Sequence, residues 1–356
     1  MEDRSGQVAP LNVALVGYGF ASKTFHAPLL VNVPGLRLSH IVSSDSSKVH
    51  KDYKDIAVLA KPDDAFALPE VDVIVIATPN ATHFDLAHKA LSAGKHVVVD
   101  KPFTNTVGEA TELIKLARSR GKILSVFQSR RWDGDFLTLR KLIADGVLGE
   151  VAVFESHYDR YRPEPRQRWR EQAVPGGGIW FDLGPHLVDQ ALQLFGPPES
   201  IYADLEIQRT LGQAVDYFHV VLRYGKNRAI LHGGLIVIAE TPRFTVHGTT
   251  GSFTKFGMDT QEDSLKRGDI PGCPGWGNDP KMGTLITKKG EGFETRQVPN
   301  IPGNYLGYYE ALRDAILSGT PSPVTAEDGL EVINVIETAI KSSTARAELP
   351  FNPIKL

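Results

Sequence analysis

The stretch LNVALVGYGFAS, residues 11–22, decides the fold of this chain. Its first half, Leu11–Val16, is a short apolar run typical of a buried parallel strand, and it leads directly into Gly17-Tyr18-Gly19. The first glycine permits a tight turn, and the second lets backbone N–H groups approach a pyrophosphate at a helix N-terminus. Ser22 stands where such turns have a third glycine, and it is small enough for close packing. The stretch predicts a strand, a dinucleotide-binding turn and a helix.

Similar apolar runs alternate with helix-like segments through the first third of the chain. The expected strands are residues 11–16, 36–42, 71–77, 96–99 and 123–127, and the expected helices are residues 82–93 and 107–120. Runs that are apolar on both faces suit parallel strands covered by helices. We therefore expect an α/β Rossmann domain, a doubly wound parallel sheet, over residues 1–130.

The pattern changes after residue 130, because most of the following strands come without crossover helices between them. The expected strands are residues 151–158, 200–207, 217–224, 229–238 and 244–247, and the expected helices are residues 136–144, 182–195, 305–317 and 326–345. Consecutive strands indicate an antiparallel sheet, which predicts an α+β substrate-binding and oligomerisation domain over residues 131–356 with a large, mostly antiparallel, open-faced sheet. Residues 259–282, rich in Gly, Pro and charge, predict a long surface excursion.

Composition excludes several classes of protein. The 356 residues are 42% hydrophobic and 23% charged with a net charge of -3, which gives no general attraction to nucleic acid or anionic membranes. Cys273 is the single cysteine, so neither an intramolecular disulfide nor a cysteine metal cluster can form. The polar leader Met1–Pro10 lacks the apolar core of a signal peptide, and Val71–Ala77 is far shorter than the about 20 residues of a membrane span. We expect a cytoplasmic protein with neither nucleic-acid nor membrane partners.

The end of the second strand bears on the choice between NAD and NADP. NAD enzymes usually place Asp or Glu there to accept hydrogen bonds from the ribose. Here the strand ends in Ser43-Ser44, with Lys48 a turn later, and two hydroxyls plus an ammonium can hold a 2′-phosphate. A serine-rich turn that caps the next helix is the alternative, and Asp45 counts against a phosphate. The sequence favours NADP, with NAD as the second possibility.

Two motifs follow neighbouring strands whose carboxyl ends face the expected cofactor crevice. Thr78-Pro79-Asn80 follows one strand, and Asp100-Lys101-Pro102 follows the next. Pro102 restricts the backbone of Lys101 and so holds its ammonium in one place. A solvated surface lysine would not need this restriction.

A third motif supplies a carboxylate and an imidazole. Asp182 and His186 are four residues apart and would share one face of a helix, with Pro185 in its first turn. The positive end of the helix dipole favours ionised Asp182 and neutral His186, so the histidine suits a general base near neutral pH. An N-cap aspartate beside a structural histidine is the alternative.

Taken together, these motifs resemble the Gfo/Idh/MocA family of oxidoreductases over essentially the whole chain. The motifs that carry the resemblance are the glycine turn and residues 78–83, 93–97, 100–103 and 182–189. Residues 128–133, 158–163 and 168–171 are similar to the branch that contains NADP-dependent scyllo-inositol dehydrogenase and its uncharacterised bacterial relatives. The family usually has Glu where Asp100 stands, and the shorter acid keeps the charge.

The resemblance implies that Lys101 touches nicotinamide ribose and substrate, Asp182 holds the substrate and His186 exchanges its proton. The five arginines of residues 160–170 suit a loop over the active site better than a nucleic-acid patch. With the loop there, Tyr158 and Arg160 are candidates to contact a hydroxylated substrate. The residues expected to bind the cofactor are Gly17, Gly19, Phe20, Ala21, Ser43, Ser44, Lys48, Thr78, Pro79, Asn80, His83, Asp100, Lys101, Gln128, Trp132, Trp169 and Arg170.

The sequence thus predicts an NADP-dependent dehydrogenase or reductase acting on a cyclic polyol or sugar. A non-enzymatic dinucleotide-binding regulator and a dinucleotide-dependent glycosidase are the alternatives. The chemistry needs no metal, since the Lys101 ammonium polarises the substrate, and the histidines on expected strands, His157, His219, His232 and His247, are read as ordinary sheet residues. We expect a homodimer or homotetramer formed through the C-terminal sheet.

Overall fold

The structure, a computed structural model, describes residues 9–356, so most of the predicted leader Met1–Pro10 lies outside the described residues. The chain divides into two compact units. Unit 1 contains residues 9–129, 261–276 and 304–330, and unit 2 contains residues 130–260, 277–303 and 331–356. Within residues 9–356, no helix has the length and apolar character needed to cross a membrane.

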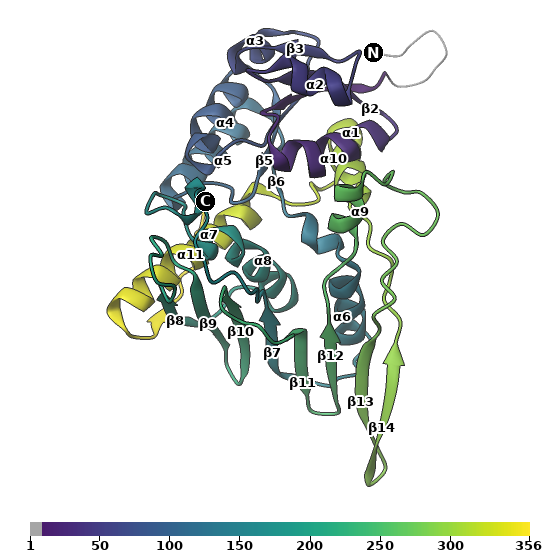
Figure 1. Ribbon diagram of the computed structural model, residues 1–356, viewed down its shortest axis with the longest axis vertical. Coiled ribbons are helices and arrows are strands. Elements are labelled where there is room, and N and C mark those ends of the chain that lie inside the picture. The colour runs from purple at the N-terminus through teal and green to yellow at the C-terminus, as the bar shows by residue number, and fades with distance from the viewer. Residues whose placement is uncertain (1–8) are drawn as a thin grey trace. The chain divides into compact units, whose positions relative to one another are not determined.

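Unit 1 is built on a parallel sheet of six strands in the order β3-β2-β1-β4-β5-β6 (Figure 1). The strands are β1 (Leu11–Val16), β2 (Leu36–Val42), β3 (Ala57–Leu59), β4 (Val73–Ile76), β5 (His96–Asp100) and β6 (Leu124–Phe127). The helices are α1 (Ala27–Asn32), α2 (Ser46–Asp52), α3 (Pro62–Ala67), α4 (His83–Ser92), α5 (Val107–Arg120), α9 (Gln261–Arg267) and α10 (Leu306–Ser318). The strand order reverses between β1 and β4, which is where open parallel sheets bind ligands at their carboxyl edge. The predicted Rossmann sheet is confirmed.

Local chemistry explains where the elements of unit 1 begin and end. The three valines of β5 are all buried, as expected for a strand covered on both faces. Helix α5 begins with a capping box between Thr106 and Glu109 and ends at Gly121, whose φ of 59° places it in the left-handed region.

Unit 2 contains a nine-stranded sheet in the order β14-β13-β12-β11-β7-β10-β9-β8-β15, in which only the β7–β10 pair is parallel among the described residues. The strands are β7 (Val151–His157), β8 (Ser200–Glu206), β9 (Tyr217–Tyr224), β10 (Asn227–Gly234), β11 (Pro242–Gly248), β12 (Gly251–Phe256), β13 (Gly283–Lys289), β14 (Gly292–Val298) and β15 (Leu349–Pro350). The helices are α6 (Gly134–Ala144), α7 (Ile179–Asp182), α8 (Gly184–Phe195) and residues 331–345 of α11 (Ala326–Ala345).

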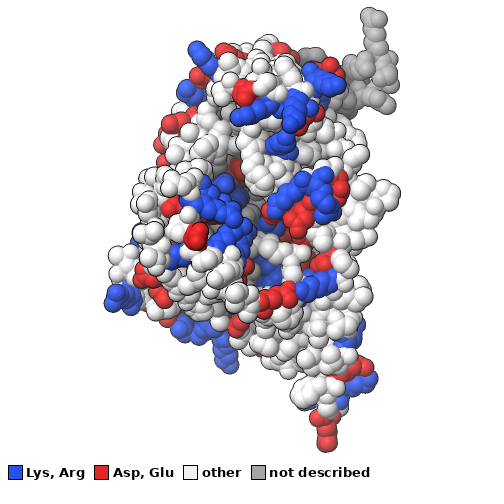
Figure 2. All heavy atoms as spheres, in the orientation of Figure 1, with Lys and Arg blue, Asp and Glu red and all other residues white. Residues whose placement is uncertain are grey.

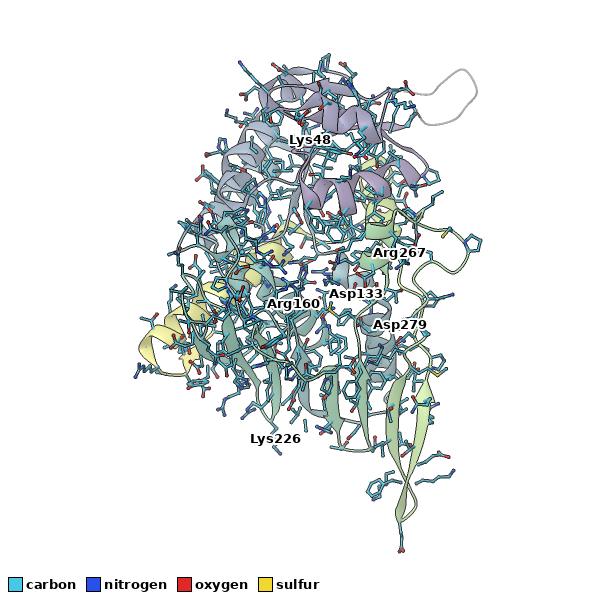
Figure 3. All side chains as sticks on the ribbon, viewed as in Figure 1. Lys48, Asp133, Arg160, Lys226, Arg267 and Asp279 are labelled. Carbon is cyan, nitrogen blue, oxygen red and sulfur yellow. The ribbon has the colours of Figure 1, made fainter. Side chains whose placement is uncertain are left out.

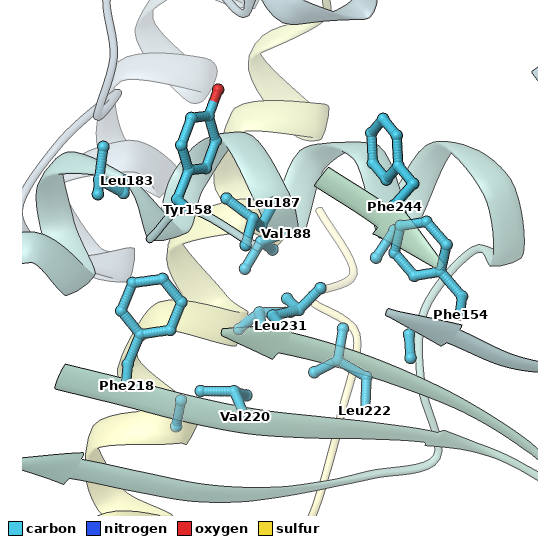
Figure 4. Packing of buried hydrophobic residues seen from close by; sticks show 14 of the residues in the cluster. Phe154, Tyr158, Leu183, Leu187, Val188, Phe218, Val220, Leu222, Leu231 and Phe244 are labelled. Carbon is cyan, nitrogen blue, oxygen red and sulfur yellow. The ribbon is translucent and has the colours of Figure 1, made fainter. Parts of the chain in front are cut away.

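One face of this sheet carries the core of unit 2, and the other is uncovered. On β9 the side chains of Phe218, Val220 and Leu222 are fully buried, and they pack with Leu187 and Val188 of α8 (Figure 4). Each such side chain contributes about 1.5–3 kcal/mol to folding. The alternate residues of β9 lie on the opposite face and are only half-buried. The predicted mostly antiparallel, open-faced sheet is confirmed.

Three details of the sequence prediction were wrong. The predicted surface excursion over residues 259–282 contains helix α9, with Gln261 and Leu265 buried in unit 1. Strands β3, β12, β13, β14 and β15 were not predicted. The helix expected over residues 182–195 begins at Gly184, and Asp182 ends the single turn of α7 before it. Leu183, with φ -108° and ψ -37°, interrupts the helix between them.

Candidate active site

The glycine turn lies at the carboxyl end of β1 and leaves room for a ligand. Gly17 has a φ of +92°, and a Cβ there would come within 2.9 Å of the Ala77 carbonyl oxygen. A Cβ at Gly19 would meet nothing within 4 Å, so the space in front of this residue is open. Ser22 is fully buried, as expected for a small residue at the place of a third glycine, and its Oγ donates to the Ala77 carbonyl oxygen at 3.3 Å. The helical segment after the turn begins at Phe20. It continues as a π-helix over Ser22–His26 and then as α1.

The residues after β2 form a capping turn. The Asp45 carboxylate accepts from the backbone N–H of Ser47 at 3.1 Å and of Lys48 at 3.3 Å, and so caps α2. Hydrogen bonding from Ser47 is the main cause that lowers the pKa of Asp45. Ser43 closes the turn through Asp45, and Ser44 is exposed. Lys48, labelled in Figure 3, has a side chain that is 71% exposed, with its ammonium 3.6 Å from Asp45.

The loops after β4 and β5 are tied together by His83. Its ring is fully buried, with Nε2 3.0 Å from the carbonyl oxygen of Thr78 and Nδ1 2.9 Å from that of Pro102. Burial lowers the pKa of His83, although the charge of Asp100 and the neighbouring carbonyl oxygens act to raise it. The two contacts join the loop after β4 to the loop after β5, and the contact of His83 with the cofactor stays a prediction. Asn80 is buried in the short 3₁₀ turn that follows Pro79.

Asp100 ends β5 and Lys101 follows it, at the same sheet edge as the glycine turn. An Asp100 carboxylate oxygen accepts from the Lys101 backbone N–H at 2.8 Å, and the other lies 3.8 Å from His26 Nε2. Burial acts to raise the pKa of Asp100, but His26 and the charge of Lys101 hold it below its usual range. The ionised carboxylate thus fixes the backbone from which the lysine extends. The Lys101–Pro102 peptide bond is cis.

Gln128, after β6, completes this edge. Its side chain is only 2% exposed, and its Oε1 has no hydrogen-bond partner among residues 9–356. Buried polar atoms normally have a partner, so an orphaned amide oxygen at a ligand-binding edge fits a bound group that donates to it. With the open space at Gly19, this residue supports the predicted fit of a dinucleotide to unit 1.

In unit 2, α8 carries His186 in its first turn, directly after Pro185. The His186 side chain is almost buried, and its ring centroid lies 6.2 Å from that of Tyr158. Asp182, at the end of α7, has a carboxylate oxygen 3.6 Å from Nε of Arg170. The predicted shared helical face is therefore replaced by two short helices, which bring both residues to the same end of α8.

A buried ion pair, not assigned a role from the sequence, anchors α8. Arg131 donates from Nε and from a terminal nitrogen to the two carboxylate oxygens of Asp189, at 2.9 and 2.7 Å. On the next residue of α8, the Gln190 amide donates to the Arg130 carbonyl and accepts from Arg243 at 2.7 Å. The signal in the sequence was Asp189, the one acidic residue of α8, three positions after His186.

Tyr158 lies among these groups with its ring buried. The Arg243 guanidinium stands 4.4 Å from its ring centroid, and burial raises the pKa of the phenol to about 12. Figure 4 shows the phenolic oxygen directed away from the apolar cluster, and within residues 9–356 it has no hydrogen-bond partner. The contact of Tyr158 with substrate stays a prediction.

The arginine-rich segment, residues 160–170, is a loop of unit 2. Glu171 organises its end by accepting from the Arg166 backbone and by pairing with Arg168 at 2.8 Å and Arg209 at 3.1 Å. Blue spheres gather in Figure 2 in the region where Figure 3 labels Arg160. Arg170 lies over the ring of Trp169 and contacts Asp182, so the loop touches the predicted site.

The predicted residues therefore fall into two groups. The glycine turn, the β2 turn, the loops after β4 and β5, and Gln128 share the carboxyl edge of the parallel sheet in unit 1. Asp182, His186 and Arg170 are brought together in unit 2, as are Tyr158 and His186. Trp132, half-buried, ends the 3₁₀ turn Ser129–Trp132 before α6, and its predicted contact with the cofactor stays a prediction.

Comparison with known proteins agrees with this division. Residues 11–128 match the oxidoreductase family model for an NAD-binding Rossmann fold, GFO_IDH_MocA, and residues 140–351 match the model for its C-terminal alpha/beta domain. The chain is 52% identical to the uncharacterized oxidoreductase YdgJ of Escherichia coli, over 95% of this chain and 98% of that one. It is 41% identical to IolW of Bacillus subtilis, a scyllo-inositol 2-dehydrogenase (NADP(+)), over 95% of each chain. The solved structure of YPO2259 from Yersinia pestis superposes with a TM-score of 0.94 at 52% identity, covering 98% of this chain and 99% of that one.

Proposed function

Because the chain belongs to the Gfo/Idh/MocA family of NAD(P)-binding oxidoreductases, we propose that it transfers a hydride between NADP and a carbon–oxygen centre of a cyclic polyol or sugar. The observation that carries the proposal is the place of Lys101. It follows β5 at the carboxyl edge that also holds the glycine turn, with the adjoining carboxylate fixing its backbone.

The proposed roles follow from the groups present. A nicotinamide held by unit 1 would supply the hydride acceptor for the carbon-bound hydrogen of the alcohol. His186 takes the hydroxyl proton, and the Lys101 ammonium stabilises the negative charge that develops on that oxygen, leaving a carbonyl product. Asp182 accepts hydrogen bonds from the other substrate hydroxyls. One imidazole that takes the proton, one ammonium that stabilises the oxygen and one carboxylate that holds the substrate thus account for the proposed oxidation of an alcohol.

NADP is supported by the turn after β2. One Asp45 carboxylate oxygen is engaged by two backbone N–H groups of α2, and the other lies 3.6 Å from the Lys48 ammonium. Exposed Ser44 and Lys48 remain to meet a 2′-phosphate. The name of the Bacillus subtilis relative also supports NADP and an inositol-like substrate. Tyr158 and Arg160 are proposed to contact that substrate, and Trp169 with Arg170 to cover the cofactor.

Self-association through the C-terminal sheet is proposed as well. Its uncovered face exposes apolar side chains, with Tyr202 43%, Ile286 40% and Phe293 80% exposed. Apolar side chains on one open face favour burial against a second copy. Sedimentation at micromolar concentration should therefore show a dimer or tetramer, and a protein that sediments only as a monomer would contradict this.

The function is tested by following nicotinamide absorbance with a panel of inositols and aldoses, each with NADP and with NAD. Turnover is expected with NADP, and Lys101→Ala or His186→Ala should reduce kcat by at least about 100-fold. Lys115→Ala on α5 and His247→Ala on β11 are the matched controls and should retain full activity. Unchanged turnover in both site variants would refute the mechanism. Dinucleotide binding without turnover would indicate a regulator, and aglycone release without net reduction would indicate a glycosidase.

A further inference from the structure

Three histidines stand side by side on the uncovered face of the unit 2 sheet. In the strand register His157 of β7 is opposite His232 of β10, which is in turn opposite His219 of β9. The ring centroids are 5.2 Å apart for the first pair and 5.7 Å for the second, as expected for directly opposed positions. Figure 1 shows these three strands next to one another. The fold therefore aligns three imidazoles from distant parts of the sequence.

A carboxylate closes one end of this row. Asp159 has one oxygen 3.2 Å from His157 Nδ1 and the other 3.4 Å from His232 Nε2. The carboxylate is fixed from behind, since it accepts from the Gly234 backbone N–H at 3.1 Å and from the Thr241 hydroxyl at 2.7 Å. Its side chain is 4% exposed, whereas the His157 and His232 side chains are 20% and 18% exposed. The three groups are thus held together but reached by solvent.

These spacings match those of a metal site. Nitrogen and oxygen ligands lie about 2.0–2.2 Å from Zn²⁺ in a tetrahedral site, so neighbouring ligand atoms are about 3.3–3.5 Å apart. One ligand atom from each of His157, Asp159 and His232 can be chosen so that all lie within 4.8 Å of one another. We propose that these three residues bind a divalent transition-metal ion of the zinc class, with the fourth position left to water.

The surroundings supply the outer contacts that metal-bound histidines need. A histidine that binds metal usually donates its other ring N–H to a carboxylate. With His157 bound through Nδ1, its Nε2 lies 3.6 Å from Glu155 Oε2. A pocket of about 160 Å³, lined by His157, Asp159, Thr241 and Met258 among others, opens beside the cluster and gives room for water on the metal.

The sequence interpretation treated these histidines as ordinary sheet residues, and metal titration separates the two possibilities. Chelator-treated full-length protein is titrated with Zn²⁺ by calorimetry and with Co²⁺ by visible absorption, neither of which depends on enzymatic turnover. One equivalent should bind per chain, with the intense absorption of tetrahedral Co²⁺. His157→Gln and His232→Gln should each weaken binding at least about 100-fold, and Glu155→Gln about 10-fold.

His247→Gln is the matched control, because His247 lies on β11 of the same sheet. Among the described residues its ring hydrogen-bonds only the Ser252 hydroxyl. It should bind both metals like the unsubstituted protein. Asp159→Asn removes the shared carboxylate, and circular dichroism shows whether that variant stays folded. If it unfolds, the two histidine variants decide the result. The proposal would be overturned if the unsubstituted protein showed no saturable metal binding. It would also be overturned if His157→Gln and His232→Gln bound the metals as tightly as the unsubstituted protein does.

Discussion

Gly17 and Gly19 stand two residues apart in one turn, and the structure predicts opposite responses to an added methyl group. At Gly17 the φ of +92° disfavours any side chain, which costs about 1–2 kcal/mol, and the 2.9 Å approach to the Ala77 carbonyl adds about 1–2 kcal/mol. Gly17→Ala should therefore destabilise unit 1 by about 2–4 kcal/mol. With about 2–4 °C lost per kcal/mol, Tm should fall by about 4–16 °C.

At Gly19 the added methyl meets only open space, so Gly19→Ala should melt within about 1 °C of the parent protein. The same methyl fills the space in front of the turn where we expect the pyrophosphate. Overpacking of about 1–3 kcal/mol would weaken dinucleotide binding by roughly 5- to 150-fold. Thermal melts and NADPH fluorescence titrations measure the two effects separately. A Gly19→Ala protein that binds NADPH normally, or a Gly17→Ala protein that melts normally, would refute this reasoning.

Three further predictions test the fold around the site. Burial is the main cause that lowers the pKa of His96 to about 4. Between pH 6.5 and 4 the unfolded chain therefore binds a proton that the folded chain does not, and the free energy of unfolding should fall by about 2 kcal/mol as the pH drops through that window. Urea titrations measure this loss, and His96→Gln should remove it. Glu171→Gln should raise the rate of tryptic cleavage in residues 160–170 about 10- to 100-fold, because the loop loses two ion pairs, and unchanged proteolysis would contradict this. Arg131→Lys keeps the charge but not the bidentate contact with Asp189, so kcat should fall at least about 10-fold without recovery at any pH, and parent-like kcat would count against the anchoring role.

The sequence predicted those parts of the fold where apolar periodicity and glycine turns agree. The parallel strands of unit 1 are such a case, because every valine of β5 is buried. Strand β14 could not be predicted in this way, since six of its seven residues are exposed and carry no alternating pattern. Strand β12 was hidden by Lys255, which is fully buried and pairs at 2.8 Å with Asp279, labelled in Figure 3. A lysine in a strand predicts an exposed position unless its distant partner is known.

The site residues divide in the same way. Lys101 and Asp100 could be placed from the sequence because they follow a strand that is itself predictable. The break before α8 could not, although Pro185 correctly indicated a first turn. No local pattern marks Leu183 as the interruption, and Trp180 of α7 donates to the Ile336 carbonyl, 156 residues away. The Arg131–Asp189 pair links positions 58 residues apart, and no local pattern reports such a contact.

The setting of α8 explains why its histidine needs polar anchors as well as a core. Leu187 and Val188 pack against the sheet, and apolar contacts of that kind fix the distance of a helix but tolerate rotation about its axis. The bidentate contact at Asp189 and the amide contacts at Gln190 are directional, so they fix that rotation. His186 lies within one turn of both anchors, and the direction of its ring therefore depends on buried hydrogen bonds. Replacing those bonds by apolar residues of similar volume could preserve stability, yet the imidazole would lose the single orientation that the proposed proton transfer requires.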